Sequence, residues 1–137
     1  RYPTAPEIRS AIKALKRGKA AGPDGLPAEL YKAAEVELEP VLRDLFEEIW
    51  TTGVTPEEWQ LSILVPVFKK GDVRCCGNYR GISLLAIAGK ILSMIVLKRI
   101  GGVLENQTGE TQAGFRGGRG TMDQIFGVKH CGVRRFH

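Results

Sequence analysis

Four basic residues lie close together in the middle of the sequence: Lys69, Lys70, Arg74 and Arg80. An arginine grips phosphate oxygens with two parallel hydrogen bonds, whereas a lysine acts as a mobile point charge. Arg80 stands where a strand is expected to begin, so its guanidinium would be held in a fixed direction and could stabilise charge on a leaving pyrophosphate. Lysines on an edge hairpin also protect proteins from aggregation, and on the residues alone both interpretations stay open.

A second candidate site is the glycine-rich segment 111–121, TQAGFRGGRGT. Its glycines allow the main chain to approach a partner closely. The side chains that could hydrogen-bond, stack on bases or clamp phosphates are Gln112, Phe115, Arg116 and Arg119. A flexible connector that happens to contain arginines is the alternative interpretation.

Other kinds of chemistry find little support in the sequence. Cys75 and Cys76 are adjacent, Cys131 is far away, and the two histidines stand in the last eight residues, so we expect neither a metal site nor a nucleophilic triad. Segment 19–22 (KAAG) lacks the order Gly-x4-Gly-Lys-Ser/Thr and the preceding strand of a phosphate-binding loop. We therefore interpret it as a turn.

Charge is distributed unevenly along the 137 residues, although the net charge is only +5. Residues 1–59 hold 8 Lys/Arg and 11 Asp/Glu, a net −3, whereas residues 60–137 hold 12 and 4, a net +8. Such asymmetry indicates a polyanionic partner of the second half, namely nucleic acid or a nucleotide. A basic solvated surface without a partner is the alternative.

The composition is that of an ordinary globular protein with about one domain. Three cysteines exclude a disulfide-stapled secreted scaffold, and the apolar stretch 82–100 is interrupted by Lys90, so we expect no membrane span. The chain starts at Arg1 without a visible targeting signal. We expect an intracellular piece of a longer protein, in the nucleus or the cytoplasm.

Helical periodicity dominates the first 60 residues. A capping box from Thr4 to Glu7 predicts a helix over 5–17 that Gly18 ends, and a short helix over 27–34 follows a turn. A third helix carries the apolar stripe from Leu38 to Trp50 and ends at Gly53. The capping-box pattern is repeated from Thr55 to Glu58.

The pattern then changes to that of strands. Residues 61–68 predict a strand that is apolar on both faces, in which Pro66 requires an edge position or a bulge. After a polar loop to Asn78, residues 79–84 predict the returning strand of an antiparallel hairpin. Residues 86–104 predict a helix that is apolar nearly all round and therefore buried, and Thr121 begins a last helix. The fold class is α+β, mainly helical with one hairpin.

Four sequence blocks, taken in order, resemble the reverse transcriptases of non-LTR (LINE-type) retrotransposons. They are residues 18–30 (GKAAGPDGLPAEL), Trp59 with 63–72 (ILVPVFKKGD), 78–85 (NYRGISLL) with Gly89 and Lys90, and 110–116 (ETQAGFR) with 118–126 (GRGTMDQIF). The resemblance covers about residues 7–128. It implies the fingers and the entry to the palm of such an enzyme, with a partial domain over 1–128 and a frayed tail over 129–137.

The resemblance also assigns roles. It implies that Arg80, with Lys69 or Lys70, faces the triphosphate of the incoming dNTP. It implies that Gln112, Phe115, Arg116 and Arg119 lie along the RNA template and DNA primer. The unusual segment 73–77 (VRCCG) leaves the direction of Arg74 open.

Nucleotide addition in this family uses two Mg²⁺ ions held by palm aspartates. Beyond residue 60 the only acids are Asp72, Glu105, Glu110 and Asp123, and none of them forms an Asp-Asp or Asp-x-Asp pair. We therefore expect neither a catalytic nor a metal-binding residue here, and no RNA-directed DNA polymerase activity without the remainder of the polymerase as a partner. The alternatives are a non-enzymatic nucleic-acid-binding module and a retrotransposon-derived remnant without function.

Overall fold

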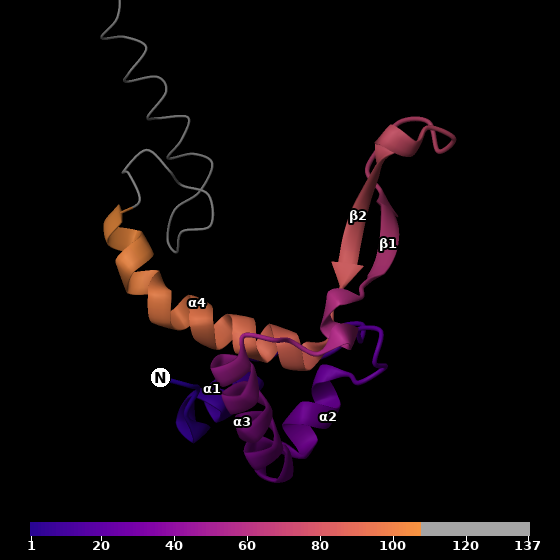
Figure 1. Cartoon of the computed structure of the whole chain (residues 1–137). Coiled ribbons are helices and arrows are strands. Elements are labelled where there is room, and N and C mark those ends of the chain that lie inside the picture. The colour runs from indigo at the N-terminus through magenta and orange to yellow at the C-terminus, as the bar shows by residue number, and fades with distance from the viewer. Residues whose placement is uncertain (108–137) are drawn as a thin grey trace, which may run out of the picture. The chain divides into compact units, whose positions relative to one another are not determined.

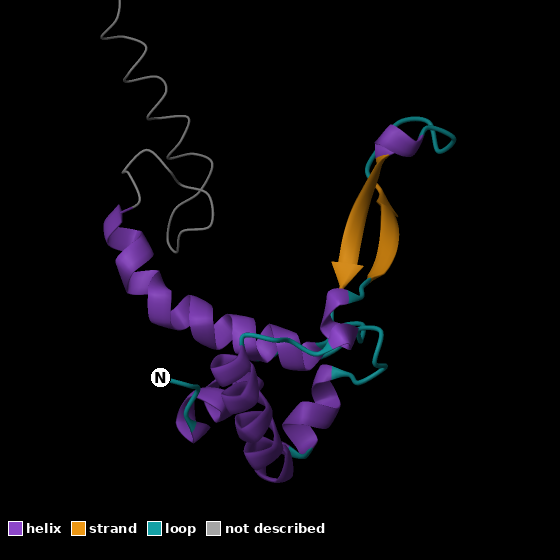
Figure 2. Ribbon diagram, viewed as in Figure 1, coloured by secondary structure: helices purple, strands orange, loops and turns teal. Residues whose placement is uncertain are grey.

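The computed structural model describes residues 1–107 and divides the chain into two compact units, Arg1–Val96 and Leu97–His137. The elements are shown in Figures 1 and 2. They are α1 (Ala5–Ala14), α2 (Ala28–Ala33), α3 (Glu35–Thr52), the 3-10 turn η1 (Glu57–Gln60), β1 (Ile63–Phe68), the 3-10 turn η2 (Cys76–Asn78), β2 (Tyr79–Leu84) and α4 (Ile87–Gln107). The predicted α+β class, mainly helical with one antiparallel hairpin, is confirmed for the described residues.

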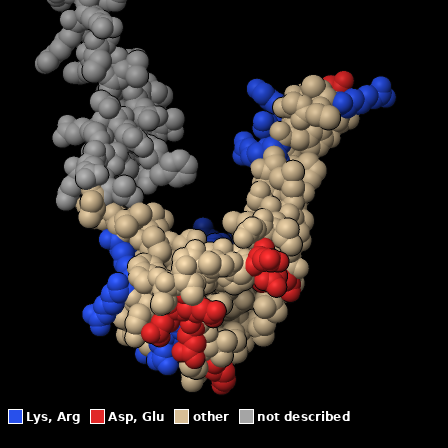
Figure 3. Space-filling model, viewed as in Figure 1, with Lys and Arg blue, Asp and Glu red and all other residues tan. Residues whose placement is uncertain are grey.

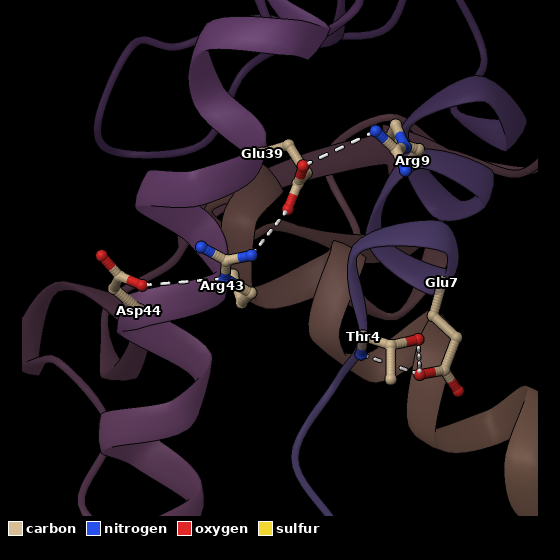
Figure 4. Close-up of polar contacts among 6 residues, drawn as sticks. All are labelled: Thr4, Glu7, Arg9, Glu39, Arg43 and Asp44. Atoms are coloured by element: carbon tan, nitrogen blue, oxygen red, sulfur yellow. Dashed lines mark hydrogen bonds and ion pairs between the residues drawn. The ribbon is translucent and has the colours of Figure 1, made fainter.

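The core of the first unit lies among α1, α3 and the beginning of α4. Phe46, Ile8, Ile12 and Ile91 are all 0% exposed, and they come from these three helices. The predicted capping box begins α1: the N–H of Thr4 donates to the Glu7 carboxylate at 2.9 Å (Figure 4). Capping of this kind fixes where the helix starts, and with it the face that α1 turns toward the core.

Ion pairs join the outer sides of α1 and α3. The carboxylate of Glu39 lies 3.7 Å from Arg9 and 3.9 Å from Arg43, as Figure 4 shows. Because the two arginines remain about half exposed, these pairs contribute little beside the apolar core.

The end of α1 differs from the prediction. The helix stops at Ala14 rather than at residue 17, because Leu15 turns into an extended conformation and buries its side chain. The Lys32 ammonium donates to the carbonyl of Lys13 at 2.6 Å and satisfies an acceptor that the ending helix leaves open. Gly18 adopts φ +66° in the loop that follows, not at the helix end.

The predicted end of α3 is confirmed, because Gly53 takes the left-handed conformation directly after Thr52. The predicted capping box at Thr55 is wrong. η1 begins after Pro56 without a side-chain cap, and it is a single 3-10 turn that leads into the hairpin.

The hairpin pairs β1 with β2 in register, with Val67 opposite Arg80 and Pro66 opposite Gly81. The N–H of Lys69 donates to the carbonyl of Asn78 at 2.8 Å, so the alternation of an antiparallel ladder makes Pro66–Gly81 a non-hydrogen-bonded pair. The missing N–H of Pro66 therefore lies on the free edge, and no bulge is needed. All six residues of β1 are exposed, although both faces are apolar.

α4 corrects a third expectation. Ile87, Ile91 and Ile95, spaced by four, form the buried face, whereas Leu97, Ile100 and Val103 are exposed. An all-round apolar surface therefore does not make this helix buried, because the core covers only one face of its first turns. Gly101 and Gly102 do not interrupt it.

Within residues 1–107, no helix combines the length and the apolar character that crossing a membrane requires. The last helix expected from Thr121, the boundary at residue 128 and the tail 129–137 lie outside the described residues.

Candidate functional site at the hairpin tip

The loop 69–78 closes the far end of the hairpin and carries most of the predicted basic cluster. Lys69 continues the ladder by one pair, so it lies on the same face as Val67 and as Arg80, which pairs with Val67. Lys69 and Arg80 are thus diagonal neighbours on one face of the hairpin. Lys70 follows at the bend. Figure 3 shows lysines and arginines gathered around this end of the hairpin.

The shape of the tip loop is set by groups other than the cations. One carboxylate oxygen of Asp72 accepts the N–H of Arg74 at 2.9 Å, and the Asn78 amide donates to the carbonyl of Asp72 at 2.8 Å. The Tyr79 hydroxyl donates to the carbonyl of Val73 at 2.9 Å. Gly71 has φ +97°, and a Cβ there would lie 2.8 Å from the Asn78 amide nitrogen, so this turn requires glycine.

An aromatic pair holds the strand ends together beneath the loop. The rings of Phe68 and Tyr79 lie 5.5 Å apart in a tilted arrangement. This pair occupies the face opposite Lys69 and Arg80, because side chains alternate along each strand. One face of the tip is therefore aromatic and the other cationic.

The four cations of the tip form no ion pair within the described part of the chain, although Asp72 adds one negative charge to the same loop. Lys69, Lys70, Arg74 and Arg80 are exposed and form no ion pair with a carboxylate of residues 1–103, whose side chains the structure describes. The hairpin thus offers ammonium and guanidinium donors on a closed loop, an arrangement that can bind a compact polyanion such as a triphosphate.

The remaining predicted site residues are placed as follows. Gln112, Phe115, Arg116 and Arg119 lie outside the described residues, so the predicted template–primer contacts stay a prediction. Cys75 and Cys76 are exposed free thiols. Among residues 1–103, whose side chains the structure describes, no three His, Cys, Asp or Glu side chains come together as a metal site.

Sequence reasoning missed a cavity of about 670 Å³ at the base of the hairpin, whose walls include Lys16, Lys19 and Lys90. Only segment 19–22, interpreted as a simple turn, gave a signal of it. The cavity joins residues more than seventy positions apart, and no periodicity of the sequence predicts such a contact.

Comparisons with known proteins give relatives from mobile elements, while no protein-family model matches the chain. A 115 kDa protein of the type-1 retrotransposable element R1DM of Drosophila melanogaster is 33% identical over 125 residues, 90% of this chain and 12% of that protein. The transposon TX1 149 kDa protein of Xenopus laevis is 28% identical over 126 residues, 92% of this chain and 10% of that protein.

A third relative is the retrovirus-related Pol polyprotein of the type-1 retrotransposable element R1 of Bradysia coprophila. It is 28% identical over 120 residues, 85% of this chain and 12% of the polyprotein. The chain thus spans about a tenth of the length of the curated relatives it matches. Over about nine-tenths of its own length it is related to proteins of non-LTR retrotransposons, a Pol polyprotein among them.

Proposed function

We propose that this chain is the fingers part of a non-LTR retrotransposon reverse transcriptase, which binds the incoming dNTP and the template–primer. The observation that carries the proposal is the exposed cationic face of the hairpin tip, where Lys69 and Arg80 are diagonal neighbours without an ion pair among residues 1–103. The relation to a Pol polyprotein supports the same assignment.

The tip can act on a triphosphate in two ways. The Arg80 backbone is part of the ladder, so its guanidinium starts from a fixed position and can bind two phosphate oxygens at once. Lys69 adds a point charge on the same face, and Lys70 supplies another from the bend. Both kinds of donor also stabilise negative charge that builds up on pyrophosphate as it leaves.

The described residues do not fit a polymerase metal centre, because no group of three potential ligands lies among them. The acids beyond residue 60 include no aspartate pair. We therefore propose that residues 1–137 bind substrates but do not extend a primer, and we derive no metal-dependent step from them.

The test combines binding with activity. We expect Arg80→Ala to weaken dNTP binding about tenfold to hundredfold in calorimetric titrations, the range for losing a charged hydrogen-bonding partner. Arg17→Ala, which removes an exposed arginine far from the hairpin in sequence, should leave dNTP affinity unchanged. Primer extension with Mg²⁺ on a primed RNA should be absent. Measurable extension, or equal dNTP affinity of wild type and Arg80→Ala, would contradict the proposal.

A second candidate function, a non-enzymatic nucleic-acid-binding module, is favoured by the net charge of +8 over residues 60–137. A chain of this kind would bind a primed duplex with strong salt dependence and would not distinguish a dNTP from other anions. Arg80→Ala separates the two functions, because only the first predicts loss of dNTP binding with duplex binding intact.

A further inference from the structure

The cavity at the base of the hairpin lies wholly within the first unit. It is formed by the loop after α1, by Thr55 and Trp59 from the segment around η1, by the end of β2 and by the first turns of α4. Its volume of about 670 Å³ falls within the range of sites that hold ligands of the size of a nucleotide. None of the tip cations Lys69, Lys70, Arg74 and Arg80 lines it.

The charged groups of the cavity all have one sign. Lys16, Lys19 and Lys90 line it, all three are exposed, and none is paired with a carboxylate of residues 1–103. No Asp or Glu stands among the described residues of its wall. Thr55 and Ser83 add hydroxyl groups. Three ammonium groups around one cavity favour a compact ligand with several negative charges.

Two close glycine contacts hold the walls in place. A Cβ on Gly22 would lie 2.5 Å from the backbone carbon and oxygen of Leu85, so the loop that carries Lys19 lies directly against the junction of β2 and α4. A Cβ on Gly89 would lie 3.2 Å from the Trp59 indole, so η1 and α4 are similarly close. These two contacts fix how the loop after α1, η1 and the beginning of α4 pack around the cavity.

The rest of the wall is apolar. Trp59 is half-buried and packs edge-on against Phe46, while Ile82 and Leu85 are 44% and 53% exposed. A ligand that combines phosphate groups with a flat apolar ring would satisfy both parts of the cavity. An acidic peptide fits less well, because its carboxylates are spread along a chain rather than gathered within the length of one nucleotide.

We propose that this cavity binds a nucleotide unit of a single-stranded nucleic acid, with phosphates held by Lys16, Lys19 and Lys90 and the base against the apolar wall. The class of ligand rests on the proposed function, but the residues are separate from those of the hairpin tip. The chain then contacts nucleic acid at a second place.

The test uses the full chain with Trp50→Phe, which leaves Trp59 as the sole tryptophan. Adding a twelve-nucleotide oligo(dT) should change the fluorescence of Trp59, and dTMP should bind far more weakly than the oligonucleotide. The double variant Lys16→Gln/Lys90→Gln should lower the slope of log affinity against log salt by about 1.4, a loss of about 25-fold at 0.1 M salt.

The matched control is Lys13→Gln/Lys98→Gln, which removes the same charge from lysines outside the cavity wall and should keep the Trp59 response. Lys19→Glu tests the same cavity independently if the double variant melts below wild type. An unchanged oligonucleotide affinity in both cavity variants would overturn the proposal. So would equal binding of dTMP, which indicates a free-nucleotide site, or equal binding of a polyglutamate peptide.

The failure of this proposal can be told apart from that of the proposed function. If Arg80→Ala loses dNTP binding while the cavity variants keep oligonucleotide binding, the cavity proposal is contradicted and the proposed function is supported. No binding of dNTP or oligonucleotide by the wild-type chain would remove both.

Discussion

The helical base and the hairpin belong to the same compact unit but are built on different principles. Phe46 and Ile91 in the base are fully buried, whereas every residue of β1 is exposed. The base thus owes its stability to a core, and the hairpin to its ladder, an aromatic pair and the hydrogen bonds of the tip loop. Since a two-stranded hairpin alone is marginally stable, the base must hold the strands together at their root.

This difference separates stability from binding along the chain. The buried residues of the core carry no charge, and the four tip cations proposed to bind phosphate are all exposed. Substitutions in the core of the base should therefore lower the free energy of unfolding, whereas substitutions of the tip cations should change binding and leave stability nearly unchanged.

The largest effect is expected for Phe46→Ala. The ring is 0% exposed and contacts Trp59, so its removal leaves a cavity and should lower the free energy of unfolding by about 3–5 kcal/mol. Urea denaturation followed by circular dichroism measures this loss. Phe68→Ala is the matched change in the hairpin and should cost less than about 1 kcal/mol, because the Phe68 ring is 42% exposed. Similar losses of unfolding free energy in both variants would contradict the conclusion that only the base is stabilised by a buried core.

A smaller effect is expected where the two regions join. Gly22→Ala places a methyl group 2.5 Å from the backbone of Leu85, and the backbone shift that follows should cost about 1–3 kcal/mol. Denaturant titration compares it with Gly102→Ala, whose added Cβ meets nothing within 4 Å in α4. The control should be neutral or stabilising by up to about 1 kcal/mol, because alanine favours helix. A neutral Gly22→Ala would show that the loop after α1 is not held at the root of the hairpin.

The smallest effect concerns the loop that carries Gly18. The pKa of Glu29 is lowered from its ordinary value of 4.5, chiefly because its carboxylate accepts the N–H of Gly18 at 2.6 Å. A lowered folded-state pKa gives stability that is present above pH 4.5 and is lost as the pH falls through that lowered value.

Thermal melts of wild type and Glu29→Gln should therefore differ at pH 6 and converge as the pH falls below 4.5. Asp44→Asn, which changes an exposed carboxylate of α3 that accepts no hydrogen bond from an N–H of residues 1–107, is the control. A difference between wild type and Glu29→Gln that stays constant from pH 6 to pH 3 would exclude the proposed role of this hydrogen bond.

The sequence was sufficient to predict elements whose residues repeat locally. Alternation predicted the hairpin, and Gly53 predicted the end of α3, because both signals lie within a few residues of the structure they specify. The end of α1 was not predictable in this way, since Leu15 leaves the helix to reach the core that α3 helps to form. The prediction that α4 is buried on all sides was wrong for the same reason. Burial of each face depends on which distant elements pack against it, and local periodicity does not show this.

In the candidate site, too, local features could be predicted and long-range contacts could not. The presence of Lys69, Lys70 and Arg80 near a turn could be seen in the sequence, but their distribution over the two faces depends on the register, which one residue of slip would reverse. Segment 19–22 was noted in the sequence, but the cavity that it helps to form was not predictable, because it depends on the contact of Gly22 with Leu85.

One property of the tip follows from how its loop is held. Gly71, Asp72 and Asn78 maintain its path through their own conformations and hydrogen bonds, and the neighbouring lysines take no part in that scaffold except through the backbone N–H of Lys69. Exchange of the side chains at positions 69, 70 and 74 should therefore leave the path of the loop unchanged, whereas exchange of Gly71, Asp72 or Asn78 should disturb it. The charge of the tip can thus change without a change in the conformation of its loop.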